Sequence, residues 1–102
     1  MKSRKEALEE FLSQEPGDSF SRYALALELV KEDQCEAAAS QLEQVIALEP
    51  SYLAAYFHLG RLLATSGRIK EAREVYTRGV TVAASANDQR TRAELQEALD
   101  AL

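Results

Sequence analysis

The sequence SYLAAYFHLGRLLATSGRIKEAREVYTRGVTVAA at residues 51–84 contains two amphipathic segments separated by a short polar tract. Its apolar and small residues recur every three or four positions, as on one face of a helix: Tyr56, Leu59, Gly60, Leu62 and Leu63, then Ile69, Ala72, Val75, Tyr76 and Val80. The tract between them includes Gly67, which can adopt a left-handed backbone conformation without steric cost and therefore suits a helix end. The stretch predicts two antiparallel helices joined by a tight turn.

The same pattern occurs in the stretch that immediately precedes this one. Alignment of residues 16–50 with residues 50–84 pairs Pro16 with Pro50, Leu25 with Leu59, Ala26 with Gly60, Leu29 with Leu63, Ala38 with Ala72, Leu42 with Tyr76 and Ile46 with Val80. Most matching positions are apolar or small, which is how a repeated structural unit diverges. The pattern predicts six helices, over residues 2–14, 19–31, 35–48, 52–65, 69–84 and 88–101. Asp18 and Ser51 are candidate N-caps, and Asn87 or Asp88 is the candidate cap of the last helix.

This unit resembles the tetratricopeptide repeat, a helix-turn-helix of about 34 residues whose pattern is W-x2-L-G-x2-Y, then A-x3-F, then P. The second copy reads Tyr56-x2-Leu59-Gly60-x2-Leu63 and Ala72-x3-Tyr76, and the first reads Arg22-x2-Leu25-Ala26-x2-Leu29, Ala38-x3-Leu42 and Pro50. The resemblance implies an all-α fold of antiparallel helix-turn-helix repeats stacked in a right-handed superhelix. It implies one domain over residues 1–102, with a half repeat at 2–16, repeats at 17–50 and 51–84, and a capping helix at 87–102. The motif residues are expected to pack the repeats together.

Several positions depart from the family pattern. Arg22 replaces a large aromatic residue, so the outer packing of the first repeat is expected to be weaker or to use the aliphatic stem of this side chain. Val45 and Gly79 replace alanine, and Ala84 replaces the terminal proline, so the fifth helix can continue past residue 84.

The last segment leaves the repeat pattern but remains amphipathic. Its apolar residues form a stripe at helical spacing, composed of Leu95, Ala98, Leu99 and Leu102. We interpret it as a capping helix that covers the apolar side of the last repeat. The alternative is that it docks into the groove of its own chain or of a neighbouring copy.

Composition and charge narrow the function classes. The chain has 102 residues, 46% of them hydrophobic and 28% charged, which is typical of a globular domain. The net charge of −5 argues against nucleic-acid binding, and the longest apolar run, Tyr52 to Phe57, is too short to span a membrane. The single cysteine, Cys35, forms no intrachain disulfide, and a cytoplasmic location is expected.

Charge is also uneven along the chain, because residues 1–60 carry five basic and eleven acidic side chains whereas residues 61–92 carry seven and three. This asymmetry could steer an acidic partner or a second copy, or it could reflect solvated helix faces.

The first helix of each repeat lines the concave face in this family, and ligands usually contact that face. The offset within the repeat places seven candidate partner-binding residues there: Phe20, Tyr23, Leu27, Lys31, Phe57, His58 and Arg61. An apolar groove with basic residues at its rim is typical of a protein-binding surface. The alternative is that these residues bury one another or lie under the terminal helix.

Other site types lack the residues they need. Some family members hold the tail of a heat-shock chaperone with a lysine and two asparagines, but the corresponding positions are Tyr23, Leu27 and His58, so we do not predict this activity. His58 is the only histidine and Cys35 has no partner to activate it, so no metal or cofactor is expected. No nucleophile with a base and no phosphate-binding loop is present, so an enzyme is not expected.

The sequence therefore predicts a non-catalytic module that binds a peptide or helix of a partner protein in its concave groove. The alternatives are a self-assembling scaffold, such as a homodimer, in which the groove or the capping helix forms the interface, and a segment of a longer scaffold.

Overall fold

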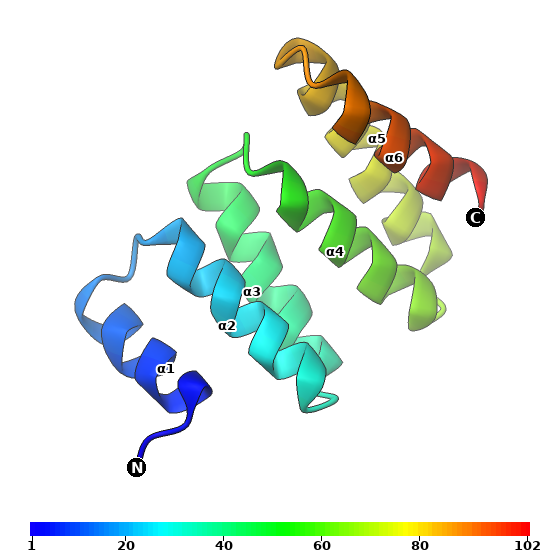
Figure 1. Ribbon diagram of the computed structural model, residues 1–102. Helices are drawn as coiled ribbons and strands as arrows, with labels where there is room; N and C mark the ends of the chain where they lie inside the picture. Colours follow the sequence, from blue (N-terminus) through cyan, green and yellow to red (C-terminus); the bar gives the residue numbers. More distant parts are fainter. The chain divides into compact units, whose positions relative to one another are not determined.

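The computed structural model describes residues 1–102, which form six α-helices and no strands. The helices are α1 Arg4–Gln14, α2 Ser19–Lys31, α3 Cys35–Leu48, α4 Leu53–Thr65, α5 Ile69–Ser85 and α6 Gln89–Asp100 (Figure 1). The predicted all-α class is confirmed, and each helix end lies within two residues of its predicted position. The chain divides into two compact units, Met1–Glu49 with α1 to α3 and Pro50–Leu102 with α4 to α6.

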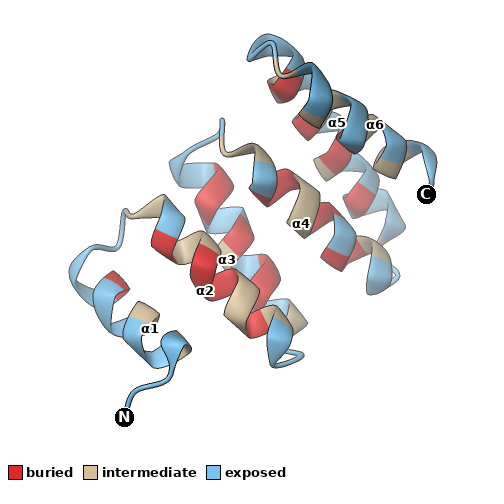
Figure 2. Cartoon of the chain, viewed as in Figure 1, coloured by how far each residue is buried: buried red, intermediate tan, exposed pale blue.

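Within each unit, the middle helix packs against the other two. In the first unit α2 contacts α1 and α3, and in the second α5 contacts α4 and α6. Figure 2 shows buried residues along α2 and α3, whereas most of α1 is exposed. Each unit therefore buries its core mainly between one pair of antiparallel helices, with a third helix covering one side.

Three tight turns reverse the chain between helices. Their central residues, Asp33, Gly67 and Asn87, have φ angles of 59°, 80° and 59°. In each turn the next N–H bonds a carbonyl five residues back: Gln34 to Leu29 at 2.9 Å, Arg68 to Leu63 at 2.8 Å and Asp88 to Ala83 at 3.0 Å. This is the Schellman arrangement, which satisfies the last carbonyls of a helix. The predicted conformation of Gly67 is confirmed.

Side-chain caps start three of the helices. Ser3 and Glu6 form a reciprocal capping box at α1, Asp18 accepts from Ser21 N–H at 3.1 Å, and Asp88 accepts from Thr91 N–H at 3.0 Å. The predicted cap at Ser51 is wrong, because α4 begins after Tyr52 and no side chain caps it. The Tyr52 carbonyl accepts from Ala55 N–H at 3.1 Å in the first turn of this helix.

The expected packing residues form the two cores. All of them except Pro50 are buried: Leu25, Ala26, Ala38, Leu42, Tyr56, Leu59, Gly60, Leu63, Ala72 and Tyr76. Small residues permit close helix contact, since a Cβ added at Gly60 would lie 2.6 Å from a ring carbon of Tyr76. A Cβ at Gly79 would lie 2.9 Å from Cβ of Tyr56 and 3.0 Å from Leu95. Glycine in place of the alanine of the family pattern at position 79 therefore lets α5 pack closely against both α4 and α6.

A side chain near the start of α2, and another near the start of α4, donates a hydrogen bond to the carbonyl of the preceding proline. The Tyr56 hydroxyl donates to the Pro50 carbonyl at 2.6 Å, and at the equivalent place in the preceding repeat Arg22 Nη2 donates to the Pro16 carbonyl at 2.7 Å. Arg22 Nη1 also donates to Gln41 Oε1 at 2.8 Å, while its Nε is buried without a partner. The Arg22 guanidinium thus makes the hydrogen bond that the Tyr56 hydroxyl makes in the second repeat, while packing by the aliphatic stem of Arg22 stays a prediction.

The end of the chain packs as expected for a cap. α5 ends at Ser85, one residue past the predicted end, and α6 packs against α5. Leu95 of α6 is fully buried, and Ala98, Leu99 and Leu102 are partly buried. The terminal helix therefore covers an apolar side of α5.

Candidate partner-binding surface

A hollow of about 420 Å³ opens on the first unit beside α2. It is lined by Arg4, Phe20, Tyr23, Ala24, Leu27, Glu28 and Lys31. All but Arg4 come from α2, where spacings of three and four residues place them on one side of the helix. Arg4 reaches the hollow from the first turn of α1.

The floor of the hollow is apolar and accessible. Phe20 is 66% exposed, the highest value for any large hydrophobic residue within a helix. Tyr23 and Leu27 are half-buried, and Ala24 is buried. Removing the apolar surface of an exposed aromatic side chain from water is favourable, so a partner that covers Phe20 gains binding free energy.

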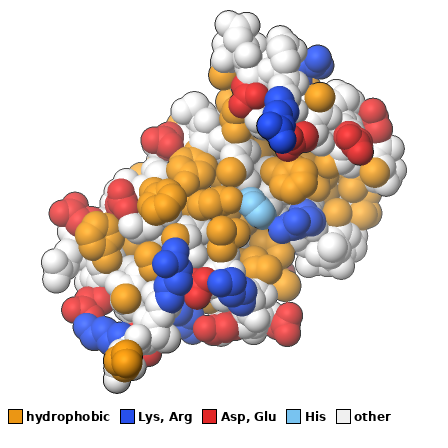
Figure 3. Space-filling view, viewed as in Figure 1, with side chains coloured by type: hydrophobic (Ala, Val, Ile, Leu, Met, Phe, Trp, Pro, Cys, Tyr) orange, Lys and Arg blue, Asp and Glu red, His pale blue; other side chains and the backbone are white.

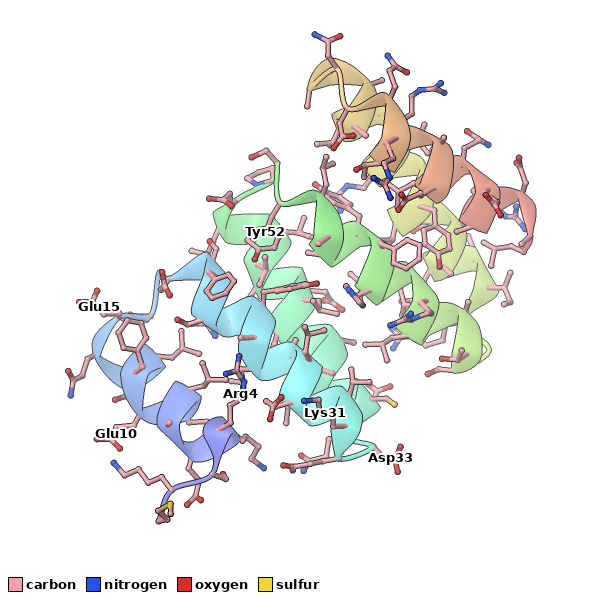
Figure 4. All side chains as sticks on the ribbon, viewed as in Figure 1. Arg4, Glu10, Glu15, Lys31, Asp33 and Tyr52 are labelled. Atoms are coloured by element: carbon pink, nitrogen blue, oxygen red, sulfur yellow. The ribbon has the colours of Figure 1, made fainter.

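The rim of the hollow carries more positive than negative charge. The Glu28 carboxylate lies 3.0 Å from Lys31 Nζ and 3.7 Å from Arg4 Nε. Glu28 is only 16% exposed, whereas Arg4 and Lys31 are 64% and 72% exposed. Figure 4 shows the Arg4 side chain between α1 and α2, and Lys31 at the C-terminal end of α2. One carboxylate is therefore shared by two accessible cations, so Arg4 or Lys31 can also pair with an acidic group of a partner.

In the second unit, three predicted residues of α4 form a compact cluster. The Arg61 guanidinium lies 5.7 Å from the centroid of the Phe57 ring, and its Nη2 lies 3.1 Å from His58 Nδ1. The His58 and Phe57 rings meet edge to face at 5.8 Å. Figure 3 shows the histidine next to a basic side chain on the molecular surface. Burial, and secondly the Arg61 charge, lowers the pKa of His58 below 6.5.

The terminal helix flanks this cluster. Two hollows, of about 250 and 320 Å³, lie between α4 and α6, and Phe57 lines both. His58 lines the smaller one, while Glu94 of α6 borders both and Glu97 borders the larger. The second unit thus presents an aromatic side chain between a basic residue of α4 and acidic residues of α6.

The structure therefore groups the predicted residues in two sets. Phe20, Tyr23, Leu27 and Lys31 line one hollow, and Phe57, His58 and Arg61 contact one another in the other unit. A groove that includes both sets stays a prediction.

Sequence reasoning missed several residues of these hollows. Glu28 could have been found, since it lies four residues after Ala24 and three before Lys31 on the same face. Arg4, Glu94 and Glu97 could not, because their places depend on how α1 and α6 pack against other helices.

Two other kinds of site are not found. No group of three or more histidine, cysteine, aspartate or glutamate side chains is arranged to hold a metal ion. None of the six helices is long and apolar enough to cross a membrane.

Comparison with known proteins establishes the family. The family model of the tetratricopeptide repeat matches residues 23–89. The solution structure of a tetratricopeptide repeat domain protein from Salinibacter ruber is 37% identical, with 82% of this chain and 85% of that chain covered and a TM-score of 0.78. A protein from Bordetella parapertussis is 30% identical, with 98% and 87% covered and a TM-score of 0.82. The crystal structure of MamA, at 21% identity and a TM-score of 0.73, with 94% and 63% covered, is similar in fold. No curated protein matches the chain.

The chain therefore belongs to the tetratricopeptide repeat family. The fold is that of an interaction or scaffold module, and proteins of this family are generally non-catalytic.

Proposed function

We propose that this protein is a non-catalytic interaction module that binds a peptide or helix of a partner protein through accessible residues of α2 in the first unit, and that the accessible residues of α4 in the second unit form a contact surface of their own. The observation that carries the proposal is the hollow of the first unit. It combines Phe20, 66% exposed, with an apolar floor and two accessible cations at its rim. This combination of an aromatic anchor and a polar rim is typical of protein interfaces.

The binding mode follows from the chemistry of the hollow. An apolar side chain of the partner would bury Phe20 and Leu27, which supplies the main favourable free energy. A neighbouring carboxylate would pair with Arg4 or Lys31 and fix the orientation of the peptide. In the second unit, Phe57 offers a further apolar contact, and Arg61 beside it offers a further cation.

The first test uses a displayed library of random peptides selected on the purified protein. Selected peptides are expected to combine apolar and acidic residues, and their Kd is measured by fluorescence polarisation. Phe20→Glu is the most informative variant, because Phe20 is exposed and its replacement leaves the core intact. We expect it to weaken binding by at least about tenfold, which corresponds to about 1.4 kcal/mol.

Matched variants separate binding from folding. Leu48→Glu introduces the same charge at another exposed apolar residue of the same unit, 49% exposed and outside the hollow, and should leave the Kd unchanged. Leu27→Glu should weaken binding at the hollow at least as much as Phe20→Glu, and Phe57→Glu should weaken it less, because Phe57 lies in the second unit and outside the hollow. The helical circular dichroism signal should persist in both variants. If the selected peptides bind wild type, Phe20→Glu and Leu27→Glu equally well, the hollow is not the binding site.

A further inference from the structure

The two hollows between α4 and α6 have Phe57 and Glu94 in common, and we call them together the α4–α6 groove. Three alanines also line this groove: Ala54, Ala98 and Ala101. Ala54 and Ala101 are exposed, and Ala98 is partly buried. Small side chains at a contact allow a further helix to approach closely. The groove therefore combines an aromatic ring with small side chains that give a partner access to it.

Each wall of the α4–α6 groove carries a charge that has no ion-pair partner in the chain. On α4, the exposed Arg61 lies with its guanidinium 5.7 Å from the centroid of the Phe57 ring and pairs with no carboxylate. On α6, the exposed Glu97 lines the larger hollow and pairs with no cation. Glu94, in contrast, already pairs with Arg90 at 3.3 Å. The unpaired charges are thus positive on the α4 wall and negative on the α6 wall.

This charge arrangement defines the chemistry of a complementary partner. A partner that neutralises both walls presents a carboxylate to α4 and a cation to α6. An amphipathic helix can do so, because the residues that flank its apolar seam on either side face opposite walls of a groove. Turning such a helix end for end exchanges its flanks and brings like charges together. The two walls therefore select both the flanking residues and the direction of a bound helix.

We infer that the α4–α6 groove binds an amphipathic helix of a partner protein, with acidic residues on the flank that faces Arg61 and basic residues on the flank that faces Glu97. An apolar side chain of this helix covers Phe57. The inference rests on the contact surface proposed for the second unit and adds the chemistry of its partner. The hollow of the first unit selects differently, because its accessible charges, Arg4 and Lys31, are both basic.

Three synthetic peptides of about 20 residues, long enough to form a helix in isolation, test the charge arrangement. All share a seam of leucine and alanine. The mixed peptide has glutamate on one flank and lysine on the other, whereas the second has lysine on both flanks and the third has glutamate on both. In fluorescence polarisation, the mixed peptide should bind at least about fivefold more tightly than the other two. Equal Kd values, or no binding of the mixed peptide up to about 1 mM, would overturn the inference.

Charge reversals on the two walls should change the preferred peptide. Glu97→Lys leaves unpaired positive charge on both walls and should bind the all-glutamate peptide best, whereas Arg61→Glu should bind the all-lysine peptide best. Glu74→Lys and Arg73→Glu make the same changes of net charge at exposed residues of α5 outside the groove, and they should still prefer the mixed peptide. If these two controls change the preference as strongly, net charge decides it and the inference is wrong.

Two aromatic variants locate the bound peptide. Phe57→Glu should weaken binding of the mixed peptide by at least about tenfold, whereas Phe20→Glu, in the first unit, should leave it unchanged. If Phe20→Glu abolishes this binding and Phe57→Glu does not, the peptide occupies the hollow of the first unit. That result refutes the inference and leaves the proposed function of the first unit intact.

Two further measurements distinguish the other possible occupants. A mixed peptide with a central proline, which interrupts the helix, should bind at least about tenfold more weakly, and unchanged binding would show that the groove takes an extended segment instead. Sedimentation equilibrium tests a second copy of this chain as the occupant. Self-association of the wild type that Phe57→Glu abolishes would assign the groove to that copy and contradict the inference.

Discussion

The helix pairs α2–α3 and α4–α5 have equivalent packing contacts that are made by residues of different size. In the second unit Gly60 of α4 faces Tyr76 of α5, and in the first unit the corresponding pair is Ala26 and Leu42. Ala26 and Leu42 are fully buried, and Tyr76 is 4% exposed. A smaller residue on one helix therefore accompanies a larger one on the other. We expect the two positions to be energetically coupled.

The cost of breaking this match follows from the geometry. A Cβ added at position 60 would lie 2.6 and 2.7 Å from two ring carbons of Tyr76, whereas ordinary contact begins at 3.4 Å. The buried ring would have to move by about 0.7 Å or more, and overpacking of this kind costs about 1–3 kcal/mol. Alanine regains about 1 kcal/mol of helix propensity. Gly60→Ala should therefore lower the free energy of unfolding by up to about 2 kcal/mol.

The decisive variant is the double substitution Gly60→Ala with Tyr76→Leu, which places the pair of the first unit in the second. Tyr76→Leu alone leaves a cavity and should cost about 2–3 kcal/mol. In the double variant the leucine fits the alanine, so the loss should fall short of the sum by at least about 1 kcal/mol. Urea unfolding followed by circular dichroism gives the four free energies, with Gly17→Ala, whose Cβ meets no atom within 4 Å, as the control. Additive losses, or a Gly60→Ala variant more stable than wild type, would refute the reasoning.

Three further predictions concern helix ends and His58. Asp33→Gly should stabilise the chain by about 0.5–1 kcal/mol in urea unfolding, because Asp33 has a φ of 59° that glycine adopts without strain. The hydrogen bond from Thr91 N–H lowers the pKa of Asp88, so its stabilisation of α6 is complete above the usual value of 3.8 and is lost as pH falls through the lowered one. The protection factors of the α6 amides, which correct for the intrinsic pH dependence of exchange, should therefore fall in acid for wild type, be low at all pH values for Asp88→Ala, and lose this fall in acid in Asp88→Asn. Burial is the larger cause of the lowered pKa of His58, so Arg61→Ala should raise that pKa only part of the way to 6.5 in an NMR titration. Because folding favours neutral His58, its contribution to stability is complete above pH 6.5 and declines as pH falls through the lowered pKa.

The helices could be predicted closely because local signals agree with the repeat. Apolar spacing, proline positions and the left-handed turn at Gly67 all mark the same boundaries. The failure at Ser51 has a local cause, since α4 begins after Tyr52 and leaves Ser51 outside the helix. A capping residue type in a loop does not decide which residue begins the helix.

The candidate surface was predictable only where one helix determines it. Phe20, Tyr23, Leu27 and Lys31 share a face of α2, so their spacing predicts their proximity. The contribution of Arg4 depends on the packing of α1, and that of Glu94 depends on the packing of α6. Neither is encoded in a short spacing.

Arg22 provides the sharpest case in which a departure from the repeat pattern has a measurable cost. Its Nη2 donates to the Pro16 carbonyl as the Tyr56 hydroxyl donates to the Pro50 carbonyl, so the hydrogen bond to the proline carbonyl is present in both repeats. The guanidinium nevertheless leaves Nε buried without a partner, and an unsatisfied buried donor costs about 1–3 kcal/mol. A tyrosine at this position would keep one hydrogen bond and remove that donor.

Arg22→Tyr should therefore raise the free energy of unfolding by about 1 kcal/mol, since Gln41, which loses a partner, is partly exposed and can bond water. Arg22→Phe separates the two effects, because it removes the unsatisfied donor but also the hydrogen bond to Pro16, and should be less stable than Arg22→Tyr. Tyr56→Phe removes the same hydrogen bond in the second unit, so it should lower the free energy of unfolding by about the difference between Arg22→Tyr and Arg22→Phe. Tyr56→Phe shows whether this hydrogen bond stabilises the chain. If it does, and Arg22→Tyr nevertheless lowers the free energy of unfolding, the prediction is wrong. The hydrogen bonds of the guanidinium to Pro16 and Gln41 then outweigh the cost of the unsatisfied Nε, and arginine is the more stabilising residue at this position.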